Sequence, residues 1–92
     1  MSHEIGVDTP RQENGTFRCT VRIGGRSYDV TVSEDDVRAL APDATPGELI
    51  AESFRFLLER EPPGSILPRF DLSVIGRYFP EYGKEIAGRL AR

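Results

Sequence analysis

Few residues of this chain could carry chemistry, and they lie apart in the sequence. Nucleophilic catalysis needs a Cys or Ser beside a base, and the chain has one cysteine, Cys19, and one histidine, His3. Cys19 belongs to an alternating apolar run, where burial raises the pKa of a thiol and hides it from reagents. His3 lies in a polar terminal segment with nothing to hold it beside Cys19. We therefore predict that the protein has no catalytic residues and is not an enzyme.

No metal or cofactor site is expected either. A structural zinc site needs about four Cys or His ligands, far more than this chain supplies. The acidic run Glu34-Asp35-Asp36 lacks the spacing of a calcium-binding loop, and acids in the first turn of a helix are explained by the helix dipole. Gly24-Gly25-Arg26 precedes a predicted strand, whereas a phosphate loop precedes a helix N-terminus. We expect no metal, no cofactor and no small-molecule substrate.

Three arginines suggest nucleic-acid recognition as one hypothesis. Arg18 and Arg22 project from the polar face of a predicted hairpin, and Arg26 lies at its tip. A two-stranded ribbon with such a row can enter the major groove of DNA. Against this, Asp29 lies across from Thr20 on the same face, and the formal net charge of the chain is −3. Nucleic-acid binding is therefore the second of our two hypotheses.

The aromatic residues support the first hypothesis, a protein interface. Residues 54–82 hold four of the five Phe and two of the three Tyr. Short helices cannot bury so many rings, so a few are expected at the surface as anchors for a protein partner, and an unpaired hairpin edge is a second docking element. A weak homodimer is one form that this interaction could take. The candidate interface residues are Phe70, Tyr78, Phe79 and Tyr82.

A β-hairpin is the first element that positions these residues. Apolar and polar residues alternate over 16–23 and again over 26–32, and the intervening Gly24-Gly25 is typical of a type I′ or II′ turn. A two-residue loop fixes the register, because a slip by one residue would expose half of the apolar stripe. The predicted cross-strand pairs are Ile23–Arg26, Val21–Tyr28, Cys19–Val30 and Phe17–Val32.

The residues before the hairpin are polar. Residues 1–15 have too few apolar groups to offset an ordering entropy of about 1–2 kcal/mol per residue. We interpret 1–15 as a flexible N-terminal tail and 16–92 as a single domain. Whether Ile5 and Val7 add a short third strand at the edge stays open.

Short helices are predicted after the hairpin. The strongest helix-start signal is Thr45-Pro46-Gly47-Glu48, a capping box with proline at the first helical position, which predicts a helix to about Arg60. A hairpin alone is marginal in water, so helices must cover its apolar face. The fold class is therefore α+β, a β-hairpin packed against three to four short helices. Helix starts are predicted at Ser33, Thr45, Asp71 and Pro80.

Size and hydropathy limit the remaining options. A chain of 92 residues fits one small domain with a modest core. No apolar stretch approaches the roughly 20 residues that span a bilayer, and residues 1–10 lack the basic and apolar regions of a secretory signal. We expect a cytoplasmic protein with no membrane partner.

Four short segments carry a resemblance: FLLERE, SIL, F-D-L and YFPEY. Together with the preceding hairpin they resemble a group of small, functionally uncharacterised prokaryotic proteins, over about residues 16–90. The resemblance implies an autonomous domain and gives no catalytic residues to transfer. The hairpin followed by a helix is also similar, at the level of the fold alone, to antitoxin-like domains. We expect a small non-catalytic protein-interaction module, antitoxin-like or accessory to another protein.

Overall fold

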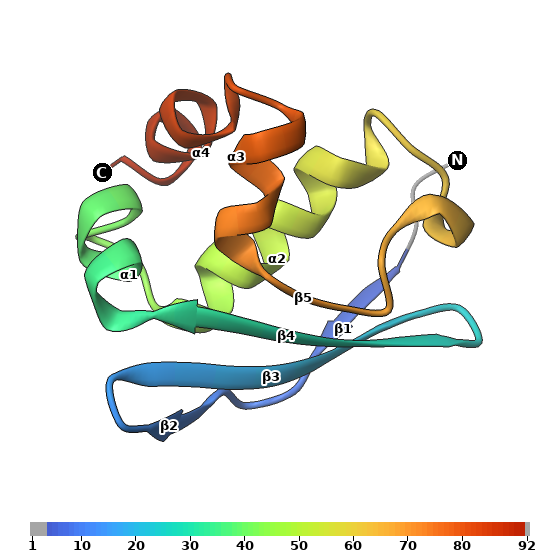
Figure 1. The fold of residues 1–92 in the computed structure, drawn as a ribbon, viewed down its shortest axis with the longest axis horizontal. Helices are drawn as coiled ribbons and strands as arrows, with labels where there is room; N and C mark the ends of the chain where they lie inside the picture. Colours follow the sequence, from blue (N-terminus) through green and yellow to red (C-terminus); the bar gives the residue numbers. More distant parts are fainter. Residues whose placement is uncertain (1–3, 92) are drawn as a thin grey trace.

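A mixed β-sheet forms one layer of the structure, and helices cover one of its faces (Figure 1). The computed structural model describes residues 4–91. This arrangement confirms the predicted α+β class. In chain order the elements are β1 (Ile5–Val7), β2 (Arg11–Glu13), β3 (Thr16–Ile23), β4 (Arg26–Ser33), α1 (Glu34–Leu40), α2 (Pro46–Leu58), the 3₁₀ turn η1 (Pro63–Ser65), β5 (Arg69–Asp71), the 3₁₀ turn η2 (Leu72–Val74), α3 (Ile75–Tyr78) and α4 (Tyr82–Leu90).

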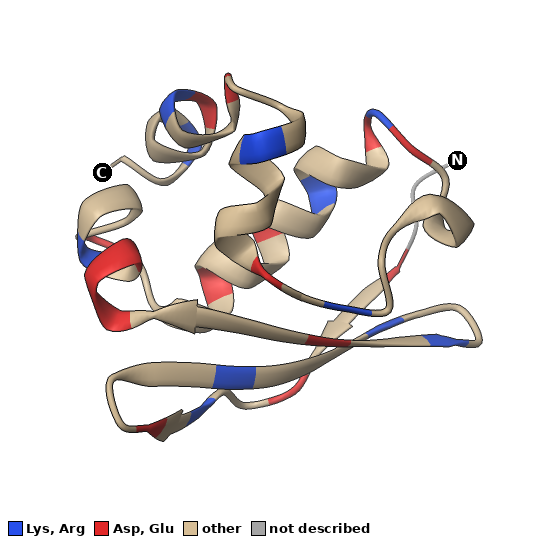
Figure 2. Ribbon diagram, viewed as in Figure 1, with Lys and Arg blue, Asp and Glu red and all other residues tan. Residues whose placement is uncertain are grey.

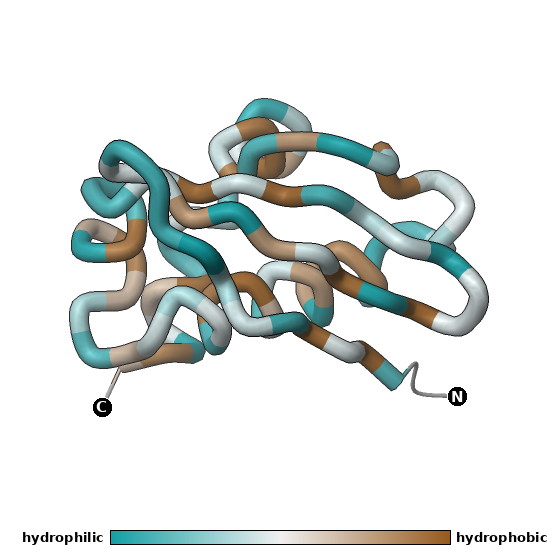
Figure 3. The backbone as a smooth tube through the Cα atoms, turned by 90° about the horizontal axis from the view of Figure 1, so that it is seen from below, coloured by the Kyte–Doolittle hydropathy of each residue, from teal (hydrophilic) through white to brown (hydrophobic). Residues whose placement is uncertain are grey.

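The hairpin of β3 and β4 has the predicted register. Of the two turn glycines only Gly24 has a positive φ, 59°, as a type II′ turn requires. The apolar residues of both strands point toward the helices, and Figure 3 shows apolar and polar residues alternating along the strands of the sheet. The observed pairs are Ile23 with Arg26, Val21 with Tyr28, Cys19 with Val30, and Phe17 with Val32.

The segment before β3 is paired, so the interpretation of residues 1–15 as a flexible tail must be corrected. β1 and β2 both pair antiparallel with β3, and the open alternative of a strand at Ile5 and Val7 is confirmed. Residues 8–10 form a bulge between them, since these three residues span two residues of β3. The Asp8 amide donates to the Thr20 carbonyl at 3.1 Å within this bulge. His3 lies outside the described residues.

Asn14-Gly15 is the turn that joins β2 to β3. Both residues have a positive φ, 48° and 78°, which is the backbone of a type I′ turn. The prediction of a flexible tail was wrong because it considered only the number of apolar residues in this segment. An Asn-Gly pair before an alternating run is a strong hairpin signal, and backbone pairing with β3 organises this polar segment.

The helices begin largely where the sequence predicts. Ser33 caps α1 by accepting from the Asp36 amide, and Thr45 forms both bonds of the capping box with Glu48. The prediction for Pro80 was two residues early, because α4 begins at Tyr82. The core lies between the sheet and the helices. Its fully buried apolar side chains include Val21, Val30, Val32, Leu49, Ile50, Phe54, Phe56, Leu72 and Ile86.

β5 is an element that the sequence analysis did not predict. It pairs parallel with β4, and Asp29 of β4 donates its amide to the Pro68 carbonyl at 2.8 Å. The predicted hairpin is therefore flanked on both sides, β3 by β1 and β2, and residues 29–31 of β4 by β5. A free hairpin edge is thus not the docking element that we expected.

We predict that Thr45→Ala lowers the free energy of unfolding by about 0.5–2 kcal/mol, because the Glu48 amide loses its acceptor at the start of α2. Thr45→Ser keeps the hydroxyl and is expected to retain most of the stability. Urea denaturation of the three proteins measures both effects. Equal midpoints for the Ala and Ser variants would contradict a role for the cap.

We predict that Gly15→Ala costs about 1–2 kcal/mol, because alanine is strained at a φ of 78°. The matched control is Gly25→Ala in the other turn, where no described atom beyond the neighbouring residues lies within 4 Å of an added Cβ. That control should change stability by less than about 0.5 kcal/mol. If Gly15→Ala matches the control in urea denaturation, the β2–β3 hairpin does not contribute to the folded state.

Candidate functional site

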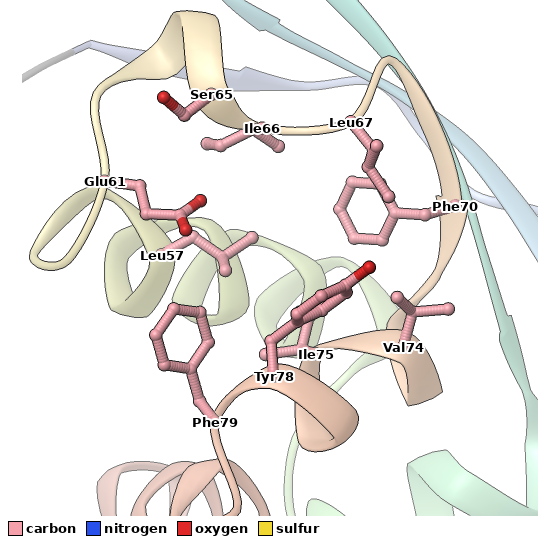
Figure 4. A pocket seen from close by; sticks show the side chains of 10 residues that line it. All are labelled: Leu57, Glu61, Ser65, Ile66, Leu67, Phe70, Val74, Ile75, Tyr78 and Phe79. Carbon is pink, nitrogen blue, oxygen red and sulfur yellow. The ribbon is translucent and has the colours of Figure 1, made fainter.

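An apolar groove of about 210 Å³ opens between the end of α2, the segment 65–70 and α3 (Figure 4). Three successive stretches within residues 57–79 form its walls, so the groove depends on how the chain folds back between them. Its lining side chains are Leu57, Glu61, Ser65, Ile66, Leu67, Phe70, Val74, Ile75, Tyr78 and Phe79.

Local sequence signals place these walls. Pro62-Pro63-Gly64 follows α2 and turns the chain into η1, so that the helix cannot continue across the groove. The Tyr28 hydroxyl donates to the Pro63 carbonyl at 2.6 Å and holds this turn against the sheet. Asp71 then ends β5 and caps η2 by accepting from the Ser73 amide at 3.0 Å, as predicted. The cap directs the chain into α3, which forms the opposite wall.

The mouth of the groove is unusually apolar for a surface. Tyr78 is 70% exposed and Leu67 is 49% exposed, and the Tyr78 ring points from α3 toward Leu67 and Phe70 (Figure 4). Two aromatic residues of the groove pack against phenylalanines of the core. Phe70 packs against Phe54 with ring centroids 5.8 Å apart, and Phe79 meets Phe56 edge to face at 5.9 Å. A preformed apolar surface of this kind favours the docking of an apolar group.

Glu61 is the acidic residue of the groove. Its carboxylate points into the groove from the end of α2 (Figure 4). Within residues 4–91 its side chain forms no hydrogen bond or ion pair. The groove thus joins an apolar wall to one carboxylate, and no basic side chain lines it.

Three of the four predicted interface residues meet in this groove: Phe70, Tyr78 and Phe79. Tyr82 does not, and its assignment to the surface must be corrected. It is 3% exposed, and its hydroxyl lies 2.7 Å from the Ser53 hydroxyl in the core. Buried tyrosines usually find such a partner for the hydroxyl. Its helical spacing with the buried residues of α4 already indicated this orientation.

Leu67 and Glu61 are groove residues that the sequence analysis missed. Neither belongs to a periodic pattern that assigns it to a site. The exposed apolar Leu67 beside Pro68 was the available signal, because a large apolar residue in a proline-bounded loop has little local means of burial.

The three arginines do not form one cationic row. Arg22 pairs with Asp8 through two bonds of 2.9 and 3.2 Å, and Arg18 lies 3.8 Å from Glu13. Arg26 pairs with Ile23 and so lies on the helix side of the sheet, away from the other two. Acidic and basic residues are interspersed along the strands (Figure 2), which lowers the positive potential that a polyanion needs.

Cys19 is buried within the core. Burial, followed by the charge of Asp8, raises the pKa of its thiol, although a hydrogen bond to the Asp8 carbonyl at 3.0 Å opposes the shift. A raised pKa disfavours the reactive thiolate. Among residues 4–91, no three His, Cys, Asp or Glu side chains gather as a metal site requires.

No helix in the described part of the chain is long and apolar enough to cross a membrane.

No protein-family model, curated protein or solved structure matches this chain.

The contact of Tyr82 with Ser53 gives a prediction about pH. Burial is the largest cause that raises the pKa of Tyr82 to about 12; the hydrogen bond with Ser53 opposes this, and Asp36 and Asp71 add to it. An unfolded tyrosine ionises near pH 10, so the unfolded state loses its proton first and the free energy of unfolding falls as pH rises from about 10 to 12. This residue should account for a loss of about 2–3 kcal/mol across that window.

Tyr82→Phe is expected to remove this part of the pH dependence. The measurement is urea denaturation of both proteins at neutral pH and at several values in the alkaline window. The neutral point gives the cost of losing the hydroxyl itself. Parallel curves for the two proteins throughout would show that the Tyr82 hydroxyl does not titrate as the buried geometry requires.

Proposed function

We propose that this protein is a small, non-catalytic interaction module, and that its groove receives an apolar side chain from another protein. The supporting observation is that Leu67 and Tyr78, the large hydrophobic residues exposed among residues 4–91, both lie at the mouth of one apolar groove. Partly exposed aromatic and aliphatic side chains around a pocket are typical anchors of protein interfaces.

The size of the groove favours a side chain over a small molecule. Its volume of about 210 Å³ lies below the roughly 300–1,000 Å³ of pockets that enclose small-molecule ligands. The walls are apolar except for Glu61, Ser65 and the Tyr78 hydroxyl, so a highly polar metabolite would find few partners. One inserted apolar side chain, with its backbone lying across Leu67 and Tyr78, fits these dimensions.

Another protein is a better occupant than a second copy of this chain. A symmetric dimer would place the same patch against itself and bring two Glu61 carboxylates into one interface, whereas a different protein can present a complementary charge. A weak homodimer remains an outcome that the experiment below distinguishes.

The similarity to antitoxin-like domains, which is at the level of the fold alone, suggests one kind of partner, a toxin held inactive by complex formation. An accessory role in a larger assembly would use the groove in the same way. We place the interaction in the cytoplasm, where the unpaired Cys19 stays reduced. The nucleic-acid alternative has less support, since the arginines of the sheet face acidic neighbours.

We predict that a photo-crosslinker in place of Tyr78, such as p-benzoylphenylalanine, captures a specific protein in the native cell. The matched probe replaces Thr20, between Arg18 and Arg22 on the polar face of the sheet. We expect protein adducts from position 78 only, and their loss when Leu67→Glu places a charge at the mouth of the groove.

Four results would count against this proposal. Adducts from position 20 alone, or adducts at 78 that persist with Leu67→Glu, would contradict docking in the groove. Crosslinked nucleic acid at position 20 would favour the alternative function. A crosslinked dimer of this chain at position 78 would identify the partner as a second copy, contrary to the proposed occupant.

A further inference from the structure

We infer that the groove selects partner segments in which a Lys or Arg adjoins the inserted apolar side chain, and that Glu61 recognises this cation. The inference rests on the proposed function and adds the charge of the partner to it.

The position of Glu61 supports this assignment. Its side chain is half-buried, lines the groove and directs its carboxylate inward (Figure 4). No residue between 4 and 91 supplies a hydrogen-bond donor or a cation to it. A half-buried carboxylate beside an apolar wall gains more from a cation than a fully solvated one, because less water screens the pair. An apolar side chain in the groove would exclude water further.

Two nearby acids, Glu59 at the end of α2 and Glu85 in α4, are paired with arginines, whereas Glu61 is not. Glu59 accepts from Arg89 at 2.6 Å, and Glu85 accepts from Arg60 at 2.9 Å. These ion pairs lie on the side of α2 that faces α4. They leave those carboxylates little capacity to bind a partner's cation.

Arg60 directly precedes Glu61 in the chain, but its guanidinium forms its contacts elsewhere and does not pair with Glu61. The guanidinium carbon of Arg60 lies 3.6 Å from the centre of the Phe56 ring, and the side chain also bonds the Phe56 carbonyl at 3.1 Å. The guanidinium carbon also lies 5.8 Å from the centre of the Phe79 ring, and its shortest ion pair is with Glu85 at 2.9 Å and not with Glu61. Within residues 4–91 Glu61 thus has no cation paired with it, and the cation that we propose is one supplied by the partner.

The charge of the lining also selects among partners. Because the groove contains one carboxylate and no basic side chain, an acidic residue beside the anchor would meet a like charge in a partly desolvated site. A second copy that inserted Tyr78 would bring the adjacent Arg77, but a symmetric contact would also place two Glu61 carboxylates in one interface. A basic, apolar segment of a different protein therefore fits the groove better.

The test uses three synthetic peptides, GSKFLKSG, GSQFLQSG and GSEFLESG, which share an apolar pair and differ only in flanking charge. Titrations followed by ¹⁵N–¹H correlation spectra report both the affinity and the residues that are perturbed. We expect shifts at groove residues with all three, and binding of the basic peptide about three- to tenfold tighter than the acidic one. This difference should shrink in about 1 M salt, where the Debye length falls to about 3 Å.

Variants separate the charge effect from the groove itself. Glu61→Gln should remove the preference for the basic peptide over the acidic one. Asp43→Asn is the matched control, because it removes one exposed negative charge outside the groove, and it should keep the preference.

The outcomes are distinguishable. If the three peptides bind the groove equally, or if Glu61→Gln keeps the preference, recognition of a cation by Glu61 is wrong while the groove stands as a docking site. If no peptide shifts the groove resonances, the groove itself fails as a docking site for apolar segments, and this inference fails with it.

Discussion

The parallel pairing of β5 with β4 is the constraint on which the groove depends. Three contacts tie residues 63–71 to β4: Tyr28 to the Pro63 carbonyl at 2.6 Å, the Asp29 amide to the Pro68 carbonyl at 2.8 Å, and the Thr31 hydroxyl to Asp71 at 2.6 Å. Burial raises the pKa of Asp71, but hydrogen bonds from Thr31 and Ser73 outweigh it and lower the pKa overall, which favours the carboxylate that accepts both bonds. Without these contacts the wall formed by Leu67 and Phe70 would have no fixed position.

The packing of α2 against α4 supports the groove from the side of α2. Arg60 and Arg89 connect the end of α2 with α4 through Glu59 and Glu85, and Arg60 stacks on Phe56. Exposed ion pairs contribute little singly, but a shared network on an aromatic ring costs less side-chain entropy for each pair. The network holds α4 beside Phe56, and that ring in turn packs against Phe79 at the floor of the groove. The network also pairs Glu59 and Glu85 with arginines. Glu61 takes no part in it and lines the groove.

The local part of the fold could be predicted from the sequence, and the non-local part could not. The hairpin register and the caps at Ser33, Thr45 and Asp71 follow from alternation and from residues a few positions apart, so the structure confirms them. β5 has three residues and a partner about 40 positions away, so no periodic signal reveals it. The same limit applies to the site: Phe70, Tyr78 and Phe79 could be chosen as aromatic residues, whereas Leu67 and Glu61 join them only through tertiary pairing. The error at Tyr82 arose because exposure was inferred from the number of rings instead of from the face of α4.

The two edges of the sheet differ in a way that bears on partner choice. The edge formed by β1 and β2 carries a bulge at residues 8–10 that includes Pro10, and both features oppose pairing with another strand. The β5 edge ends beside the apolar groove instead, because Pro62-Pro63-Gly64 stops α2 before it can cover Leu67 and Tyr78. One edge is thus protected against association, while the other lies next to uncovered apolar side chains. A partner that docks from the β5 side would bury these side chains and meet Glu61 in the same approach, so the proposed apolar anchoring and charge selection would act at a single site.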